Sequence, residues 1–277
     1  MALHIMNSTV EPGGGPKAYP GTQAVVRALR LLKAFGSGPV ERGLAELSRE
    51  QGLNKTTAYR LLTALESEGL VERGRSREAW RLGSELIALG SRAGGALDLG
   101  SAGRAELEAL ARETRETASL EVLVGRDTLI VDEVQGGYMI GTAPAAGTRW
   151  PAHATSTGKV ILAFTDEATL KAFLAVPLAR CTTRTLVTAA ALRRDLQRVR
   201  ERGYAVTTEE LEAGFVAVGA PVRDAAGRVV AAVSVGGPRA RLGVGAVADL
   251  VLRLPQTAER ISQRLGYRDS SRKKAQS

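Results

Sequence analysis

The sequence predicts an α+β protein with two domains, a small helical one followed by a larger one built on a mainly antiparallel sheet. Three helix patterns and two short strand patterns follow one another within residues 22–83. Beyond residue 117, strand patterns joined by hairpin turns alternate with amphipathic helices. Residues 20–83 carry 11 Lys/Arg against 7 Asp/Glu, whereas residues 84–267 carry 22 against 20. A basic segment beside a nearly neutral one suggests a polyanion-binding domain joined to a different one.

The composition is that of a globular protein, and the counts of cysteine and histidine argue against several kinds of site. The single cysteine, Cys181, allows no internal disulfide framework, and two histidines make a transition-metal site unfavourable. No apolar run approaches the roughly 18 residues of a membrane span. We therefore expect no cofactor, no metal, no membrane partner and a cytoplasmic protein. Residues 1–20 lack the pattern of a signal peptide, and we expect them and the basic segment 268–277 to be disordered tails.

The first two helices are predicted from the periodicity of apolar residues. Residues 22–35 place one apolar stripe on a helix with Thr22 as N-cap and Gly36 as the stop, and the stripe consists of Val25, Ala28, Leu29, Leu32 and Phe35. A shorter helix follows around residues 44–51, and its inward-facing residues are Leu44 and Leu47. Gly52 permits a tight turn before the next helix.

The third helix begins after Asn54, a good N-cap, and ends before Gly69, which suits the left-handed position after a helix. Its inward face repeats at i, i+3, i+4 and i+7, through Ala58, Leu61, Leu62 and Leu65. Residues 70–83 then predict two short strands whose inward side chains are Val71, Trp80 and Leu82. The polar turn between these strands holds Arg73, Arg75 and Arg77.

Three helices followed by a basic hairpin form a winged helix-turn-helix, which we predict for residues 21–83. The leucines dock the third helix on the other two and leave its first turn and outer face free to enter the major groove of double-stranded DNA. We expect this face to contact bases and phosphates through Asn54, Lys55, Thr56, Thr57, Tyr59 and Arg60. The wing should reach the flanking backbone or minor groove through Arg73, Arg75 and Arg77. One amphipathic helix would more often be solvated surface, but the whole ordered set favours DNA binding.

A linker helix is predicted over residues 84–100, loosening at Gly94-Gly95, and the second domain over residues 101–267. This domain starts with a helix over 101–116 and continues with strands over 117–125, 127–136 and 138–143. Helices follow over 156–164, 166–175 and 190–203, then strands over 204–210, 215–224 and 227–237. A last helix spans roughly 244–265, and Pro255 should kink or split it.

The loop "AHATSTGK" at 152–159 resembles a phosphate-binding P-loop only in its final Gly-Lys. Ala152 replaces the first glycine of that motif and Val160 follows the lysine, so a nucleotide-phosphate site is improbable. Two interpretations stay open: a loop that enters a helix capped by Thr155 or Ser156, and a site for a small carboxylate at the helix N-terminus.

The sequence contains no set of residues in a pattern typical of a catalytic site. A histidine-dependent triad would have to use His153, and the sequence contains no G-x-S-x-G turn. Cys181 is better explained as a structural or loop thiol, and the acidic cluster Glu209, Glu210 and Glu212 as a solvated loop. Ser234 lies at a strand end, where it either bonds to the backbone or lines a pocket.

In combination, these segments resemble the IclR-type bacterial transcription regulators. The segments "VVRALRLLKAF", "LAELSREQGLNKTTAYRLLTALESEGLVER" and "WRLG" are similar to the winged helix-turn-helix of that family. Those similar to its effector domain are "ARETRETASLEVL", "PAHATSTGKVILA" and the long run from "RVRERGYAVTTEE" to "VSVGGPRARL". The resemblance covers nearly all of residues 21–266 in order.

The resemblance implies a C-terminal GAF-like α/β effector-binding domain that dimerises and commonly pairs dimers into tetramers. It also implies a small organic effector, a carboxylate or an aromatic compound, that alters the binding of operator DNA. The implied effector site lies near Met139, Thr155, Ser156, Thr157, Thr207, Ala217, Ser234 and Gly236. Members that bind very small keto acids tend to have Asp and Cys in place of Thr207 and Ala217, and Ser in place of Gly236. These departures argue for a larger or less polar effector.

We therefore predict a ligand-responsive DNA-binding transcription regulator that acts as a homo-oligomer, either a dimer or a dimer of dimers. Two other classes stay open at this level. One is a metabolite-processing enzyme on the GAF-like domain, which turnover of a bound metabolite would reveal. The other is a sensor module whose winged helix binds a protein partner in place of DNA.

Overall fold

The computed structural model describes residues 21–36, 39–76, 78–92, 96–137 and 146–268. Arg77, Met139 and the strand predicted at 138–143 lie outside these residues. The chain folds as two compact units, Met1–Leu89 and Gly90–Ser277. Each unit is described separately below. No helix among the described residues is long and apolar enough to span a bilayer.

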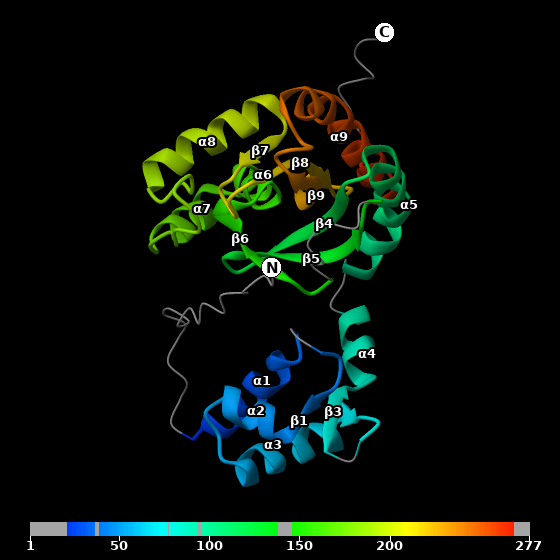
Figure 1. Ribbon diagram of the computed structural model, residues 1–277, viewed down its shortest axis with the longest axis vertical. Coiled ribbons are helices and arrows are strands. Elements are labelled where there is room, and N and C mark those ends of the chain that lie inside the picture. The colour runs from blue at the N-terminus through cyan, green and yellow to red at the C-terminus, as the bar shows by residue number, and fades with distance from the viewer. Residues whose placement is uncertain (1–20, 37–38, 77, 93–95, 138–145, 269–277) are drawn as a thin grey trace. The chain divides into compact units, whose positions relative to one another are not determined.

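The first unit is a winged helix-turn-helix, as the sequence predicts (Figure 1). Its helices are α1 (Gln23–Ala34), α2 (Leu44–Glu50) and α3 (Lys55–Ser67). A three-stranded antiparallel sheet in the order β1-β3-β2 completes it, with β1 (Arg42–Gly43), β2 (Val71–Arg73) and β3 (Ala79–Leu82). The two-residue strand β1 is too short to leave a periodic pattern, so the sequence predicts only the other two strands.

The core of this unit confirms the inward face of α3 and part of that of α1, where Phe35 is buried and Ala28 and Leu32 pack against the core. Buried residues from the helices and the hairpin form one cluster, which includes Leu31, Leu47, Leu62, Val71 and Trp80. Val25 and Leu29, predicted to face inward, are 59% and 47% exposed, and Leu31 and Ala34 are buried instead. Apolar residues occupy two adjacent stripes of α1, so periodicity alone could not select the buried one. Leu82 was also wrongly placed, because its side chain is 43% exposed.

Both ends of α3 have the predicted chemistry. The Asn54 side chain accepts a hydrogen bond of 2.7 Å from the backbone N–H of Thr57, which satisfies one of the free donors of the first turn. Gly69 follows the helix with φ +69°, a conformation that favours glycine. A Cβ at Gly83 would lie 2.1 Å from the Gly69 carbonyl oxygen, so both glycines are needed where the end of β3 passes the end of α3.

Two helices contain the described part of residues 84–100, for which the sequence predicts one linker helix that loosens at Gly94-Gly95. The helix α4 (Glu85–Arg92) crosses the boundary between the units, and α5 (Ala96–Thr114) belongs to the second unit. The first residues of α5 therefore fall in the stretch expected to be linker. Apolar residues at Leu97 and Leu99 continue the helix pattern upstream of residue 101.

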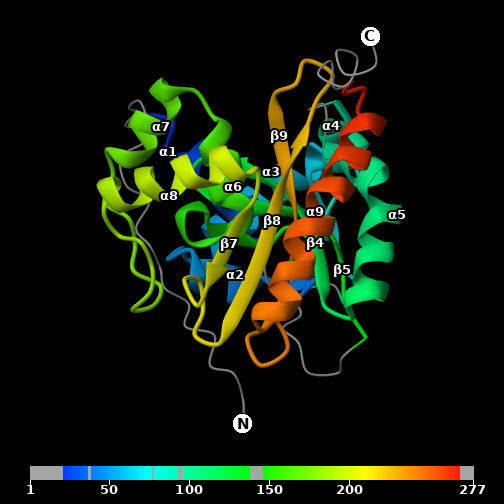
Figure 2. The ribbon, with the colours of Figure 1, turned by 90° about the horizontal axis from the view of Figure 1, so that it is seen from above.

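The second unit is a six-stranded antiparallel sheet in the order β6-β5-β4-β9-β8-β7. The strands are β4 (Thr117–Val124), β5 (Asp127–Val134), β6 (Arg149–Pro151), β7 (Ala205–Thr208), β8 (Phe215–Arg223) and β9 (Val229–Pro238). Helices α5 and α9 (Val244–Arg264) cover one face. The other face carries a 3-10 turn (Ala152–Ala154), α6 (Ser156–Phe164), α7 (Glu167–Leu174) and α8 (Ala189–Arg202), as Figure 2 shows from above.

Alternation along the strands gives each face its own core. Side chains such as Leu120, Val218 and Val233 belong to the core under α5 and α9, whereas Ala205 and Ala232 belong to the core under α6, α7 and α8. A strand that is buried on both faces cannot display a simple apolar-polar alternation. Polar residues on such a strand are therefore unusual and point to a specific role.

Of the two outcomes predicted at Pro255, a kink or a split of the last helix, the split does not occur. Helix α9 continues from Val244 to Arg264 with Pro255 inside it. Proline removes one helical hydrogen bond, but buried side chains on both sides of it, Leu254 and Ile261, anchor the helix to the sheet. The Glu106 carboxylate on α5 also pairs with two arginines of the second half, Arg260 and Arg264, at 2.8 Å each.

Candidate functional site

The outer face of α3 presents the polar residues that the sequence predicts as DNA contacts. Lys55, Thr56 and Arg60 are exposed, and Tyr59 is 45% exposed. On the opposite face of the helix, Ala58, Leu62 and Leu65 are buried. Thr57 is half-buried, and the carboxamide oxygen of Asn54 is engaged by the N-terminal cap. The first turn therefore offers a rigid exposed edge whose free side chains are cationic or hydroxylated.

Arg73 does not lie in the turn of the wing, which corrects its predicted position. It is the last residue of β2, and its guanidinium stacks 3.7 Å from the centroid of the Trp80 ring. Its Nε lies 3.2 Å from the carboxylate of Glu66 on α3, and its Nη2 donates a 3.4 Å hydrogen bond to the hydroxyl of Tyr59. Arg73 thus connects the wing to α3 from within the unit. The sequence could not show this, because the contacts of Arg73 with Trp80, Glu66 and Tyr59 form only when the hairpin packs on α3.

The turn of the wing holds Arg75, whose side chain is exposed. Its backbone N–H donates a 3.1 Å hydrogen bond to the Glu41 carboxylate, which fixes the turn against the segment before β1. Of the three arginines predicted for the wing, Arg75 is the one that the structure places at the described part of the turn.

In the second unit, most of the predicted effector residues lie on the α6 face of the sheet. Thr207 on β7 pairs with Ala217 on β8, and Ala217 pairs in turn with Gly236 on β9. Ser234 lies one pleat away on the same face, where it pairs with Gly219. Strand pairing therefore places the four predicted positions in two adjacent rows beneath α6. All four are buried.

The start of α6 lies directly against these rows. Thr155 caps the helix by accepting a 3.0 Å hydrogen bond from the Gly158 N–H, as predicted, and Ser156 and Thr157 are buried. A Cβ at Gly219 would lie 2.9 Å from the carbonyl carbon of Ser156, so the strand and the helix start approach as closely as backbones allow. The fold therefore brings the predicted loop and the predicted strand residues into one buried cluster.

Three residues that the sequence did not single out complete this cluster. Ser119 and Glu121 on β4 are both 6% exposed, and Ser119 pairs across the sheet with Ser234. The Glu121 carboxylate accepts hydrogen bonds from the hydroxyls of Ser119 at 2.8 Å and Thr157 at 2.6 Å. The Ser119 and Ser234 hydroxyl oxygens are 2.8 Å apart.

The third residue is Glu133 on β5, which pairs with Ser119 in the register of the sheet. Burial raises the pKa of the Glu133 carboxyl to about 7, and the nearby charges of Glu121 and Asp132 add to the effect. Polar and apolar residues alternate from Thr117 to Val122, the pattern of a strand with one solvated face, so the sequence carries no distinct signal for Ser119 and Glu121.

Two protein-family models match the chain in order. One describes the IclR helix-turn-helix domain and matches residues 24–75, and the other describes the C-terminal domain of the bacterial transcriptional regulator IclR and matches residues 93–263. The chain belongs to the IclR family of DNA-binding transcriptional regulators.

The similarity to individual IclR-family proteins extends over almost the whole chain. The HTH-type transcriptional regulator XynR of Escherichia coli K12 is 32% identical over 249 residues, which cover 90% of this chain and 99% of XynR. The glycerol operon regulatory protein of Streptomyces griseus is 35% identical over 247 residues, covering 88% of this chain and 96% of that protein. An IclR homologue from Microbacterium hydrocarbonoxydans, solved in complex with 4-hydroxybenzoate, has a TM-score of 0.76 at 27% identity, covering 87% of this chain and 98% of that chain.

In this IclR-family domain, the lysine of the "TGK" sequence has a structural environment. Lys159 is 1% exposed, and its Nζ lies 2.7 Å from Asp195 on α8 and 2.6 Å from Glu210 after β7. Burial raises the pKa of the Glu210 carboxyl, although Lys159 acts in the opposite direction. The prediction of a solvated acidic loop is therefore wrong for Glu210. Two carboxylates already engage the lysine, which agrees with the rejection of a P-loop.

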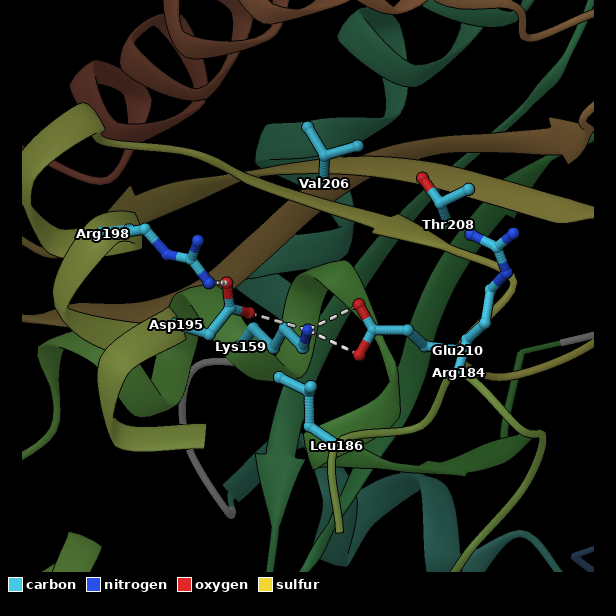
Figure 3. A pocket seen from close by; sticks show the side chains of 8 residues that line it. All are labelled: Lys159, Arg184, Leu186, Asp195, Arg198, Val206, Thr208 and Glu210. Atoms are coloured by element: carbon cyan, nitrogen blue, oxygen red, sulfur yellow. Dashed lines mark hydrogen bonds and ion pairs between the residues drawn. The ribbon is translucent and has the colours of Figure 1, made fainter. Parts of the chain in front are cut away.

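This ion cluster borders an open pocket of about 360 Å³ between α6, α8 and the edge strand β7 (Figure 3). Eight residues line it: Lys159, Arg184, Leu186, Asp195, Arg198, Val206, Thr208 and Glu210. This set includes none of the predicted effector residues. Arg198 pairs with Asp195 at 3.0 Å, so the charges that line the pocket are largely satisfied within the protein.

The two residues considered as parts of a catalytic site, His153 and Cys181, are not brought together with other catalytic groups within the part of the chain that the structure describes. His153 is 3% exposed, and its Nε2 lies 2.8 Å from the carbonyl oxygen of Ala179. Burial lowers the pKa of this imidazole, which favours the neutral form. Cys181 is exposed as a residue, and partial burial of its thiol raises the pKa of that group. Among the described residues, His, Cys, Asp and Glu do not gather in a group of three or more that could hold a metal ion.

Proposed function

We propose that this IclR-family regulator binds double-stranded operator DNA through the first turn and outer face of α3, with the wing contacting the flanking backbone or minor groove. The observation that carries this proposal is the exposure of Lys55, Thr56 and Arg60 on a helix whose other face is buried. Tyr59 adds an exposed aromatic ring, and Arg75 adds a cation at the wing turn. A helix held rigidly from behind loses little entropy when its exposed side chains meet DNA.

We also propose that the protein acts as a homo-oligomer, a dimer or a dimer of dimers. Two copies of α3 on a two-fold axis would match a roughly palindromic operator. A small organic molecule bound beneath the start of α6 would change the operator affinity. The cluster formed by Thr155, Ser156, Thr157 and Ser234 supports this location, and the solved 4-hydroxybenzoate complex of an IclR homologue supports this kind of ligand. We further propose a cytoplasmic, non-catalytic protein, in keeping with relatives that are transcriptional regulators.

Operator binding is tested with the intergenic DNA upstream of the chain's own gene, in a gel shift and by fluorescence anisotropy at several salt concentrations. Arg60→Ala should lower operator affinity by about tenfold or more, corresponding to roughly 1–3 kcal/mol, and reduce the salt dependence of binding. The matched control is Arg194→Ala, which removes one exposed arginine from α8 in the other unit and should leave binding unchanged. Equal affinities for wild type and Arg60→Ala would place α3 outside the interface.

A further inference from the structure

The hydroxyl groups beneath α6 form a hydrogen-bond chain with a defined direction. Each hydroxyl has one proton to donate. The protons of Ser119 and Thr157 go to the Glu121 carboxylate, at 2.8 and 2.6 Å. The 2.8 Å contact between Ser119 and Ser234 must therefore use the proton of Ser234, because Ser119 has none left. The hydroxyl protons of Ser119, Thr157 and Ser234 are thus all directed along these hydrogen bonds towards Glu121.

This direction determines what the cluster can offer to another molecule. Once their protons are committed, Ser234 and Thr157 retain only oxygen lone pairs, and the carboxylate of Glu121 retains the lone pairs that its two partners leave free. The cluster is therefore rich in acceptors. A bound molecule gains hydrogen bonds here by donating them.

Glu121 also takes the place that an anionic ligand would favour. The N-terminus of a helix attracts negative charge, and a carboxylate ligand at the start of α6 was one of the two interpretations of the loop. In the structure a carboxylate of the protein is bonded to Thr157, in the first turn of α6. A second carboxylate, Glu133, lies near enough for its charge and that of Glu121 to repel each other. The ion pairs of the described residues include neither carboxylate.

We infer that the effector of this regulator is a hydrogen-bond donor without a carboxylate, a hydroxylated or ammonium compound that binds at Glu121 and Ser234, and that carboxylate compounds are disfavoured there. This inference rests on the proposed function, because it assumes that the cluster beneath α6 is the effector site. The two kinds of donor share one chemistry, the donation of N–H or O–H to fixed oxygen acceptors. A carboxylate would instead confront the like charge of Glu121.

The test uses the full-length protein and sets of probes that share a framework and differ in one group. The first set is 4-hydroxybenzyl alcohol, 4-hydroxybenzylamine and 4-hydroxybenzoate, and the other two are glycerol with glycerate and xylitol with xylonate. Isothermal titration calorimetry measures each dissociation constant for the wild type and for Glu121→Gln. The alcohol or amine of at least one set should bind the wild type about tenfold or more tightly than its carboxylate partner.

Glu121→Gln should reduce this preference by about tenfold, since it removes the charge and keeps the size of the side chain. The matched control is Glu201→Gln, which removes an exposed carboxylate from α8 and should leave the preference unchanged. Ser234→Ala serves as a second variant if Glu121→Gln does not fold, and it should weaken the donor probe alone. Comparison of the amine with the alcohol distinguishes an ionic contact with Glu121 from a neutral hydrogen bond, because only the ionic contact favours the amine.

Two results would overturn the inference. One is a carboxylate probe that binds the wild type at least as tightly as its alcohol or amine partner in every set. The other is the absence of binding by all the donor probes at millimolar concentration, which would make the hydrogen-bond chain purely structural. A carboxylate that binds and changes operator affinity in the gel shift would leave the proposed function standing while refuting this inference. Absence of operator binding without any probe would instead count against the proposed function.

Discussion

Replacing Arg73 with alanine should destabilise the first unit without removing a direct DNA contact. The side chain is 35% exposed and stacks on Trp80 while it pairs with Glu66. A partly exposed stack of this kind contributes about 0.5–2 kcal/mol, and a partly exposed ion pair about 0.2–1 kcal/mol. The free energy of unfolding should therefore fall by about 1–2 kcal/mol, which corresponds to a lowering of the melting temperature by roughly 4–16 °C in a domain of this size.

The assay requires a signal from this unit alone. The chain has two tryptophans, Trp80 and Trp150, so a Trp150→Phe background leaves Trp80 as the reporter of the wing. Thermal unfolding followed by tryptophan fluorescence then compares the wild type with Arg73→Ala. Arg75→Ala is the matched control, because it removes an exposed arginine two residues further along the chain and should change the stability by less than about 0.5 kcal/mol.

Lysine substitution separates the two roles that Arg73 could have. Arg73→Lys keeps the positive charge but cannot reproduce the planar stack on Trp80 together with the hydrogen bond to Tyr59. If Arg73 acts within the unit, lysine should leave most of the stability loss in place. If Arg73→Lys restores both stability and operator affinity to the wild-type values, the side chain acts as a simple charge towards DNA and our reasoning fails.

Three further predictions concern single contacts. Asn54→Ala removes the cap of α3 and should lower the free energy of unfolding of the first unit by about 1 kcal/mol, measured by the same fluorescence assay. Lys159→Ala leaves Asp195 and Glu210 buried without their counter-charge and should cost about 3–5 kcal/mol in the second unit, measured by chemical denaturation; a loss below about 1 kcal/mol would show that water replaces the lysine. The pKa of Glu133, raised to about 7, means that the folded state holds its proton more tightly than the unfolded chain does. Stability relative to Glu133→Gln should be highest below about pH 4.5 and should fall by up to about 3 kcal/mol as the pH rises to 7; parallel profiles for both proteins would refute this.

The sequence was sufficient for the fold where local signals agree with the tertiary structure. The capping residue Asn54, the leucines behind it and Gly69 specify α3 within a single stretch, and the structure has each of them in the predicted role. The prediction for α1 is wrong at Val25 and Leu29 because two apolar stripes compete on it, and packing within the unit selects Leu31 over Leu29. The choice depends on residues that are distant in sequence.

The candidate site divides in the same way. Thr155 could be singled out because it stands at the start of a helix, where chain patterns change. Ser234 was predicted at a strand end, but β9 continues to Pro238 and holds it inside the strand. Glu121 lies inside a strand, and its role depends on the pairing of β4 with β9 and on the position of α6. Arg73 shows the same limit, since no spacing rule places its guanidinium over Trp80. Pairing between strands and stacking between elements are properties of the folded chain.

The alternation along β4 has a consequence for how this regulator could change over evolutionary time. Ala118 and Leu120 belong to the core under α5 and α9, whereas Ser119 and Glu121 face the start of α6. With the effector bound at the second pair, as we propose, substitution there would alter which molecules are recognised while the first pair continues to hold the sheet together. Recognition and folding are therefore inherited through neighbouring residues that can vary separately, so a new ligand preference can arise on an unchanged scaffold.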